Sequence, residues 1–264
     1  MKIIFPNDPL QDGRPDHVFT EEIAAATYAG LDFALVSYNA LAQHNNAPRA
    51  VRDIPAHEGP PQPAIYRGWM LTPPQYRLLY DALLSRGLRL INDHQAYSTC
   101  HLLPRALPYI KERTPRTVWV HTGTDVNFDA IMKILVPFAS RPIVVKDFVK
   151  SQKHYWHEAC YIPAADDQAA VERVVRRFIE LQGDRFLGGL VFREFVHFEP
   201  LAAEVHSGAP LNLEYRIFYL DGEPISVVPY WNSPAYAAEG PPLAAFATLA
   251  QRIPSRFFTL DVAR

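Results

Sequence analysis

The chain has 264 residues, of which 48% are hydrophobic and 12% aromatic, so it can bury a substantial core. A formal net charge of -2 excludes a nucleic-acid or membrane footprint carried by overall charge. Two cysteines are too few to staple the chain, the N-terminus lacks a signal-peptide core, and no apolar run approaches the roughly 20 residues of a spanning helix. We expect a cytoplasmic protein of two modest domains or one domain of several lobes.

The first part of the chain alternates strand and helix patterns. Strands are expected at residues 2–5, 31–38, 64–71 and 88–91, and helices at 20–30 and 72–87. This order predicts an open α/β domain over residues 1–110. The segment 102–115 carries proline at both ends and in the middle, and we place the domain boundary there. No Gly-x-Gly-x-x-Gly motif follows the first strand, so dinucleotide binding has little support.

The second part, residues 111–264, mixes the elements in another order. Apolar runs predict strands at 117–121, 142–149, 188–198 and 255–263, and helical patterns cover 127–138, 166–183 and 243–253. Residues 214–231 predict a hairpin, because Asp221 and Gly222 fit a type I′ turn. The run before Lys146 is β-branched and apolar, which is typical of a strand buried on both faces.

One group of side chains is a candidate zinc site. His154, His157 and Cys160 stand at three-residue steps and would share one face of a helix. On a strand, His157 would point away from the other two. The neighbouring Tyr155 and Trp156 favour a strand, so we expect an ordinary hydrogen-bonded sheet here.

Charged residues recur at the ends or middles of strands that otherwise look buried. They are Lys146, Arg193, Glu194, Glu214, Arg216 and Asp261. A buried charge needs a partner or a ligand. Each of them, taken singly, has an ordinary alternative, which is a solvated strand face or a structural ion pair.

Taken in order, these segments resemble the ATP-grasp superfamily. The segments are "PIVVK" at 142–146, "VFREFV" at 191–196, "EYRIFYLDGEPI" at 214–225 and "FFTLD" at 257–261. The resemblance runs from about Thr117 to the end and is closest to a bacterial and phage clade rich in arginine and lysine at this site. It implies an α/β (α+β) fold: a pre-grasp domain at 1–110 and a two-lobed ATP-grasp domain at 111–264. The first lobe would be about 111–193 and the second about 194–264.

The resemblance also implies roles for individual residues. The ATP site would contain Lys146, Lys153, Glu194, Phe195, Val196 and Glu199. Lys146 would contact the α and β phosphates, residues 194–196 the adenine, and Glu199 the ribose. Arg216 would face the γ phosphate, with Lys150 and Arg193 as further catalytic cations. Asp261 and Glu214 would hold Mg²⁺ through carboxylate oxygens.

The sequence departs from the family pattern at the phosphate flap. Many members carry a glycine-rich flap over the phosphates, whereas this chain has "KSQKHYW" at 150–156. Either Lys150, Ser151 and Lys153 replace backbone amides with side-chain donors, or the flap lies elsewhere.

The resemblance implies an ATP-dependent carboxylate–amine ligase that forms an acyl phosphate with ATP and Mg²⁺ and releases ADP. A small-molecule kinase and a non-catalytic nucleotide-binding module are the alternatives. The partner would be an unidentified small-molecule or peptide carboxylate; Arg67, Arg113 and His121 would line its pocket or be ordinary surface residues. Because the sequence ends three residues after Asp261, we also expect a shortened form of a longer chain that binds nucleotide but turns over poorly.

Overall fold

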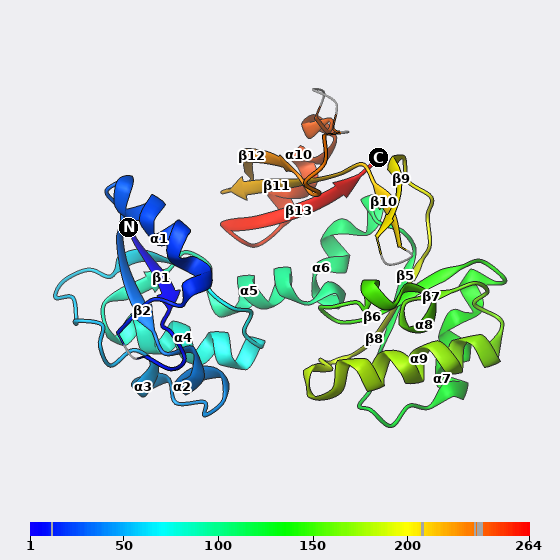
Figure 1. Cartoon of the computed structure of the whole chain (residues 1–264), viewed down its shortest axis with the longest axis horizontal. Coiled ribbons are helices and arrows are strands. Elements are labelled where there is room, and N and C mark those ends of the chain that lie inside the picture. Colours follow the sequence, from blue (N-terminus) through cyan, green and yellow to red (C-terminus); the bar gives the residue numbers. More distant parts are fainter. Residues whose placement is uncertain (12, 207–208, 235, 237–239) are drawn as a thin grey trace. The chain divides into compact units, whose positions relative to one another are not determined.

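The computed structural model describes residues 1–11, 13–206, 209–234, 236 and 240–264. The chain divides into two compact units (Figure 1). The first contains Met1–Thr99 and Ser255–Phe257, and the second contains Cys100–Pro254 and Phe258–Arg264. The division precedes the proline-rich segment because that segment is a helix of the second unit: in α6 (Leu103–Ile110), Leu103 N–H donates to the Phe148 carbonyl at 2.8 Å.

The first unit is built on a parallel sheet, as the alternating pattern predicts. Its strand order is β2-β1-β3-β4, and the neighbouring strands β1–β2, β1–β3 and β3–β4 pair in parallel. The strands are β1 (Lys2–Pro6), β2 (Asp32–Val36), β3 (Gln62–Tyr66) and β4 (Leu88–Leu90). The helices are η1 (His17–Phe19), α1 (Thr20–Tyr28), α2 (Tyr38–Ala42), α3 (Ala47–Ala50), α4 (Pro73–Ser85) and α5 (His94–His101), the last running across the division.

The chain returns to the first unit for three residues. The Asn92 side chain donates to the Phe257 carbonyl at 2.6 Å and accepts from Phe257 N–H at 3.0 Å. The Ser255 hydroxyl donates to the same Asn92 oxygen at 3.1 Å. One amide side chain therefore fixes the returning segment.

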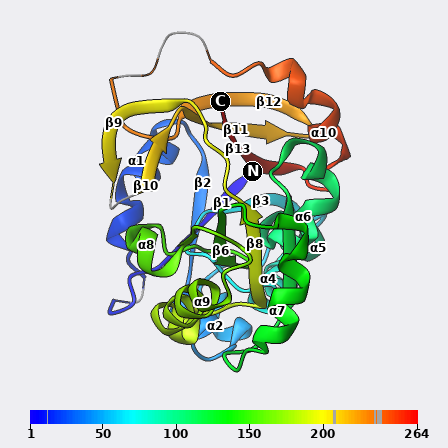
Figure 2. The ribbon, with the colours of Figure 1, turned by 90° about the vertical axis from the view of Figure 1, so that its right-hand side faces the viewer.

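The first sheet of the second unit has the strand order β5-β8-β6-β7, and these neighbouring strands pair antiparallel. Its strands are β5 (Thr117–His121), β6 (Ile143–Asp147), β7 (Tyr161–Ile162) and β8 (Gly189–Glu194). Helices α7 (Phe128–Leu135) and α9 (Gln168–Gln182) cover one face (Figures 1 and 2) and share an apolar core with it. Shorter helices are η2 (Lys111–Arg113), η3 (Val136–Phe138), η4 (Lys153–Tyr155), α8 (Trp156–Ala159) and η5 (Gly183–Arg185).

Two sequence-based expectations are wrong in this sheet. Residues 153–159 form η4 and α8 rather than a strand, and only Tyr161–Ile162 continues as β7. The strand β6 is buried on one face only: Ile143 and Val145 are buried, whereas Val144 and Lys146 are partly exposed. The second face of β6 therefore remains open to other groups.

The second sheet of this unit has the order β12-β11-β13. Its strands are β11 (Glu214–Leu220), β12 (Glu223–Pro229) and β13 (Phe257–Ala263). The predicted type I′ turn is confirmed, because Asp221 and Gly222 have φ angles of 51° and 83°. Helices η6 (Leu243–Phe246) and α10 (Ala247–Arg252) pack on the apolar face. Strands β9 (Pro200–His206) and β10 (Ala209–Asn212) form a separate ribbon. Every helix of the described residues is too short or too polar to cross a membrane.

Candidate functional site

Two cations lie on the open face of the first sheet. Lys146 of β6 pairs with Val191 of β8, and Val144 pairs with Arg193. Directly paired residues of antiparallel strands place their side chains on the same face, and neighbouring residues alternate between faces. Lys146 and Arg193 therefore share the face opposite to α7 and α9.

Burial and neighbouring charge act together on Lys146. Burial and, after it, the Arg193 charge together lower its pKa to about 8, although the adjacent Asp147 opposes the shift. The ammonium donates one hydrogen bond, to the Val149 carbonyl at 2.9 Å. An anion placed between Lys146 and Arg193 would stabilise the charged forms of both.

Arg193 carries a donor that the protein leaves unused. One terminal nitrogen donates to the Thr114 hydroxyl at 2.5 Å. Its Nε is buried and has no hydrogen-bond partner among the described residues. Burial also lowers the pKa of the guanidinium. Because an unmet buried donor is costly and a guanidinium binds anionic oxygens well, this nitrogen fits a phosphate oxygen.

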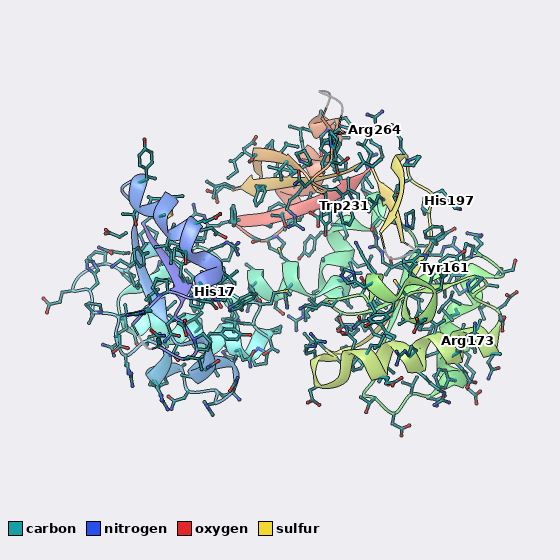
Figure 3. All side chains as sticks on the ribbon, viewed as in Figure 1. His17, Tyr161, Arg173, His197, Trp231 and Arg264 are labelled. Carbon is teal, nitrogen blue, oxygen red and sulfur yellow. The ribbon has the colours of Figure 1, made fainter. Side chains whose placement is uncertain are left out.

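Lys150 and Lys153 lie in the segment that follows β6. The Lys150 side chain is exposed, and its charge helps to lower the pKa of His101. The Lys153 ammonium lies 5.7 Å from the ring centre of Tyr230 and 6.0 Å from that of Trp231, which Figure 3 labels. These cation–π contacts join a cation of the first lobe to rings that follow β12.

The second sheet contributes an arginine and two carboxylates. Glu214 and Arg216 alternate with the buried Tyr215 and Ile217 and so share the face of β11 away from the core. Arg216 pairs with both oxygens of Asp261 on β13, at 2.7 and 2.8 Å, and lies 5.0 Å from the Tyr230 ring centre.

The two carboxylates fit a divalent cation with hard oxygen ligands. Burial raises the pKa of Glu214, Lys153 opposes this rise, and Asp261 adds to it. A cation held by both carboxylates would relieve the repulsion between their charges. In the described part of the chain, no group of three or more histidine, cysteine or acidic side chains could hold a metal ion.

The residues expected to meet the adenine lie at the end of β8. Glu194 N–H donates to the Arg116 carbonyl at 2.8 Å, and its carboxylate pairs with Arg141 at 2.9 Å. Phe195 N–H donates to the Pro142 carbonyl at 2.9 Å. Val196 is 38% exposed. Both Glu194 and Phe195 therefore use their N–H groups within the sheet.

Glu199 lies further along the same connection. Its carboxylate pairs with Arg264 at 3.3 Å, and its N–H donates to the Arg264 carbonyl. Figure 3 labels Arg264 at the end of β13. The structure therefore places Glu199 beside β13 and half exposed.

Aromatic rings gather around Phe195, which sequence reasoning did not foresee. Its ring centre lies 5.2 Å from that of Tyr161 and 4.9 Å from that of His197, both labelled in Figure 3, and 5.8 Å from that of Trp156. Trp156 and Tyr161 stack on each other at 5.5 Å. The only signal in the sequence was the aromatic content of two separate segments.

His101 was also missed. Burial, together with the charges of Lys150 and Lys146, lowers the pKa of His101 to about 4. It ends α5, far from the lysines in the sequence, so no local pattern could reveal this proximity. Of the other candidates, Arg67 pairs with Glu22 at 2.6 Å in the first unit.

The comparisons with known proteins agree with this geometry. Residues 136–264 match the model of the ATP-grasp domain, R2K clade family 3. Residues 136–264 belong to the ATP-grasp superfamily. Every side chain expected at the nucleotide and metal sites lies within this matched stretch. No curated protein matches the chain significantly.

Solved ATP-grasp structures have the fold of the whole chain. A RimK-domain ATP-grasp protein from Sphaerobacter thermophilus has a TM-score of 0.54 and 16% identity, and the match covers 100% of this chain and 86% of that one. D-alanine–D-alanine ligase from Bacillus anthracis has a TM-score of 0.59 and 13% identity, with 100% and 81% covered. The ATP-grasp ligase PsnB, solved with a minimal precursor, Mg and ADP, has a TM-score of 0.53 and 11% identity, with 99% and 84% covered.

Proposed function

We propose that the protein is an ATP-dependent carboxylate–amine ligase that works through an acyl phosphate and releases ADP in the cytoplasm. The observation that carries the proposal is the pair formed by Lys146 and Arg193, which present an ammonium and an unmet buried guanidinium N–H on one open sheet face. Such a pair suits a polyphosphate. The ATP-grasp membership of residues 136–264 supports ATP as the source of that polyphosphate.

Each part of the nucleotide would meet a different part of the domain. Lys146, with Lys153 nearby, would bind the α and β phosphates. The backbone of residues 194–196 would contact the adenine, with Phe195 and its neighbouring rings beside it. Glu199 would reach the ribose hydroxyls, and Arg193 and Lys150 would neutralise further phosphate charge.

The residues that act on the transferred γ phosphate would lie on the second sheet. Arg216 would contact the γ phosphate, and Asp261 and Glu214 would hold Mg²⁺. When bound, that ion would neutralise charge on the phosphates. Because Arg216 now pairs with both oxygens of Asp261, an ion bound at Asp261 would compete with this ion pair.

The reaction would have two steps. A carboxylate oxygen attacks the γ phosphorus, and the bond to the β–γ bridging oxygen breaks, which gives an acyl phosphate and ADP. An amine nitrogen then attacks the acyl carbon, phosphate leaves, and the amine loses a proton to the medium. The acceptor would be a small-molecule or peptide carboxylate; the similar structures include D-alanine–D-alanine ligase and the ligase PsnB in complex with a precursor peptide, which supports both possibilities.

Hydroxylamine trapping tests this function without knowledge of the amine. The chain is incubated with ATP, Mg²⁺, hydroxylamine and a panel of small-molecule and peptide carboxylates, and ADP, free phosphate and hydroxamate are measured. A ligase gives all three in equal amounts. A small-molecule kinase gives ADP with a phosphorylated acceptor but no hydroxamate, and a non-catalytic nucleotide-binding module gives none of the three. Either of the last two results would contradict the proposal.

A further inference from the structure

The loop 148–152 joins β6 to η4 and precedes Lys153. It contains no glycine, and a buried carboxylate organises its first half. One oxygen of Asp147, which is 1% exposed, accepts from the N–H groups of Val149, at 2.6 Å, and Lys150, at 2.5 Å. Asp147 N–H in turn donates to the Lys150 carbonyl at 2.9 Å. The start of the loop is therefore a closed turn.

A second buried side chain ties the other end of the loop to the same carboxylate. Gln182, the last residue of α9, is 3% exposed. Its amide nitrogen donates to the second oxygen of Asp147 at 2.8 Å. Its amide oxygen accepts from the Gln152 side chain at 2.9 Å. Gln182 therefore spans the loop and bonds to residues at both of its ends.

Packing supports the same arrangement. Phe148 is 3% exposed, and its ring lies 5.8 Å from that of Trp119 and 5.0 Å from that of His121. A Cβ added to Gly188 would come within 2.4 Å of the Phe148 ring, so backbone and ring are in close contact there. The loop is fixed by both its side chains and its hydrogen bonds.

This geometry limits how the loop can bind phosphate. The N–H groups of Val149 and Lys150 point at Asp147, so they are used inside the protein. A phosphate near this turn would meet ammonium groups in place of these two amides: Lys150 lies in the loop, and Lys146 and Lys153 flank it in the chain. The Lys146 ammonium is itself oriented by the Val149 carbonyl.

We propose that the loop 148–152 is a preformed support for phosphate-binding lysines, and that Gln182 is the positioning residue that fixes it. The proposal rests on the proposed function for the identity of the phosphate, which would be that of a nucleotide. Gln182 itself touches no nucleotide. It acts through Asp147 and Gln152, which set the places of Lys146 and Lys153.

The first test measures ADP binding by calorimetry in the full-length chain. If Gln182→Met leaves the loop in its binding arrangement about one tenth of the time, the ADP dissociation constant rises about tenfold. Gln168→Met is the matched control, because Gln168 is an exposed residue of the same helix and, within the described part of the chain, its side chain bonds to the partly exposed Glu172. An unchanged dissociation constant in Gln182→Met would overturn the proposal.

A double substitution separates positioning from general damage. Gln182→Glu places a second carboxylate against Asp147, and Asp147→Asn places two amide groups together; each should weaken ADP binding. The double variant restores one donor and one acceptor with the net charge unchanged, and should bind ADP within about threefold of the original chain, since an amide-to-carboxylate hydrogen bond is formed again with donor and acceptor exchanged. No recovery in the double variant would contradict the assigned contact.

Hydrogen exchange gives a readout that does not depend on nucleotide. In Gln182→Met, peptides covering residues 146–155 should lose protection while those of β8 and α9 keep theirs. Loss spread over the whole unit would mean that Gln182 only supports folding. If the original chain binds no ADP, the proposed function fails, and the exchange result still decides whether Gln182 fixes the loop.

Discussion

Lys146 shows how a single residue can be costly to the fold and useful to a ligand. Its ammonium is withdrawn from water beside Arg193, and together these effects lower its pKa to about 8. The sequence indicates that this lysine is unusual, because it follows an apolar strand. It could not reveal Arg193 beside it, since that contact depends on how β6 pairs with β8.

Replacing Lys146 should weaken nucleotide binding strongly. Loss of a charge-assisted contact to phosphate predicts a rise of about 10- to 100-fold in the ADP dissociation constant of Lys146→Ala. Lys111→Ala is the control, because Lys111 is exposed and lies outside the site. Calorimetric titration of both variants checks this, and equal small effects would return Lys146 to a structural role.

The lowered pKa of Lys146 predicts a pH dependence of binding. Below pH 8 the lysine is charged in the free protein; as the pH rises above about 8 it loses its proton, whereas a bound phosphate would retain it. Affinity for ADP should therefore fall above pH 8, by at most about tenfold per pH unit. Lys146→Arg should flatten the profile, because arginine stays charged. A flat profile in the original chain would contradict this assignment.

Arg216 should matter more for turnover than for affinity. A cation at the γ phosphate meets charge that shifts as the bond breaks, so Arg216→Ala should lower kcat about 100-fold or more with a smaller change in the ATP dissociation constant. Arg252→Ala, which breaks only the exposed pair with Glu112, is the control. An unchanged kcat would leave Arg216 as a structural partner of Asp261.

Elements with strong local signals could be predicted from the sequence. The hairpin of β11 and β12 follows from Asp221 and Gly222, and α9 follows from its apolar period and its cap at Asp167. The helical structure of residues 153–159 could not be predicted in this way. Tyr155 and Trp156 favour a strand locally, whereas in the structure α8 packs against α9. The contact between Gln182 and Asp147 joins residues far apart in the chain, so no local pattern contains it.

Gly189 lies at a point where the backbones of β5 and β8 approach each other closely. It has a φ of 146°, and an added Cβ would lie 2.1 Å from the Val120 carbonyl oxygen. Gly189→Ala should therefore lower the free energy of unfolding by more than about 2 kcal/mol. Gly123→Ala should be nearly neutral, because nothing lies within 4 Å of its added Cβ. Urea unfolding of the two variants makes the comparison, and equal stabilities would show that the strands can separate without cost.

At the scale of the whole molecule, the two units are not two successive stretches of the chain. The first unit takes residues from both Met1–Thr99 and Ser255–Phe257. The sequence predicts one domain boundary and no return of the chain to the first unit, because three residues are too few to form a recognisable pattern. Their hydrogen bonds with Asn92 join them to the first unit.

Asn92→Ala should weaken the attachment of residues 255–257 to the first unit. The substitution removes bonds to Phe257 and to Ser255 in a partly buried place and should cost about 2 kcal/mol of unfolding free energy. Asn39→Ala is the control, because its partly exposed side chain makes one long hydrogen bond among the described residues, to the Pro9 carbonyl at 3.4 Å. Thermal and urea unfolding report the difference. Equal stability of the two variants would mean that backbone packing alone retains the tripeptide.

The returning tripeptide makes the first unit a discontinuous cassette. A gene fragment encoding residues 1–99 omits Ser255, Arg256 and Phe257, and leaves the Asn92 amide to bond with water. Exchange of the first unit between related proteins therefore has to carry a matching tripeptide at a distant point of the reading frame. The strand β13 is subject to the same requirement, because it begins at Phe257, which belongs to the first unit, and bears Asp261, which belongs to the second. A replacement for this strand must therefore fit both units.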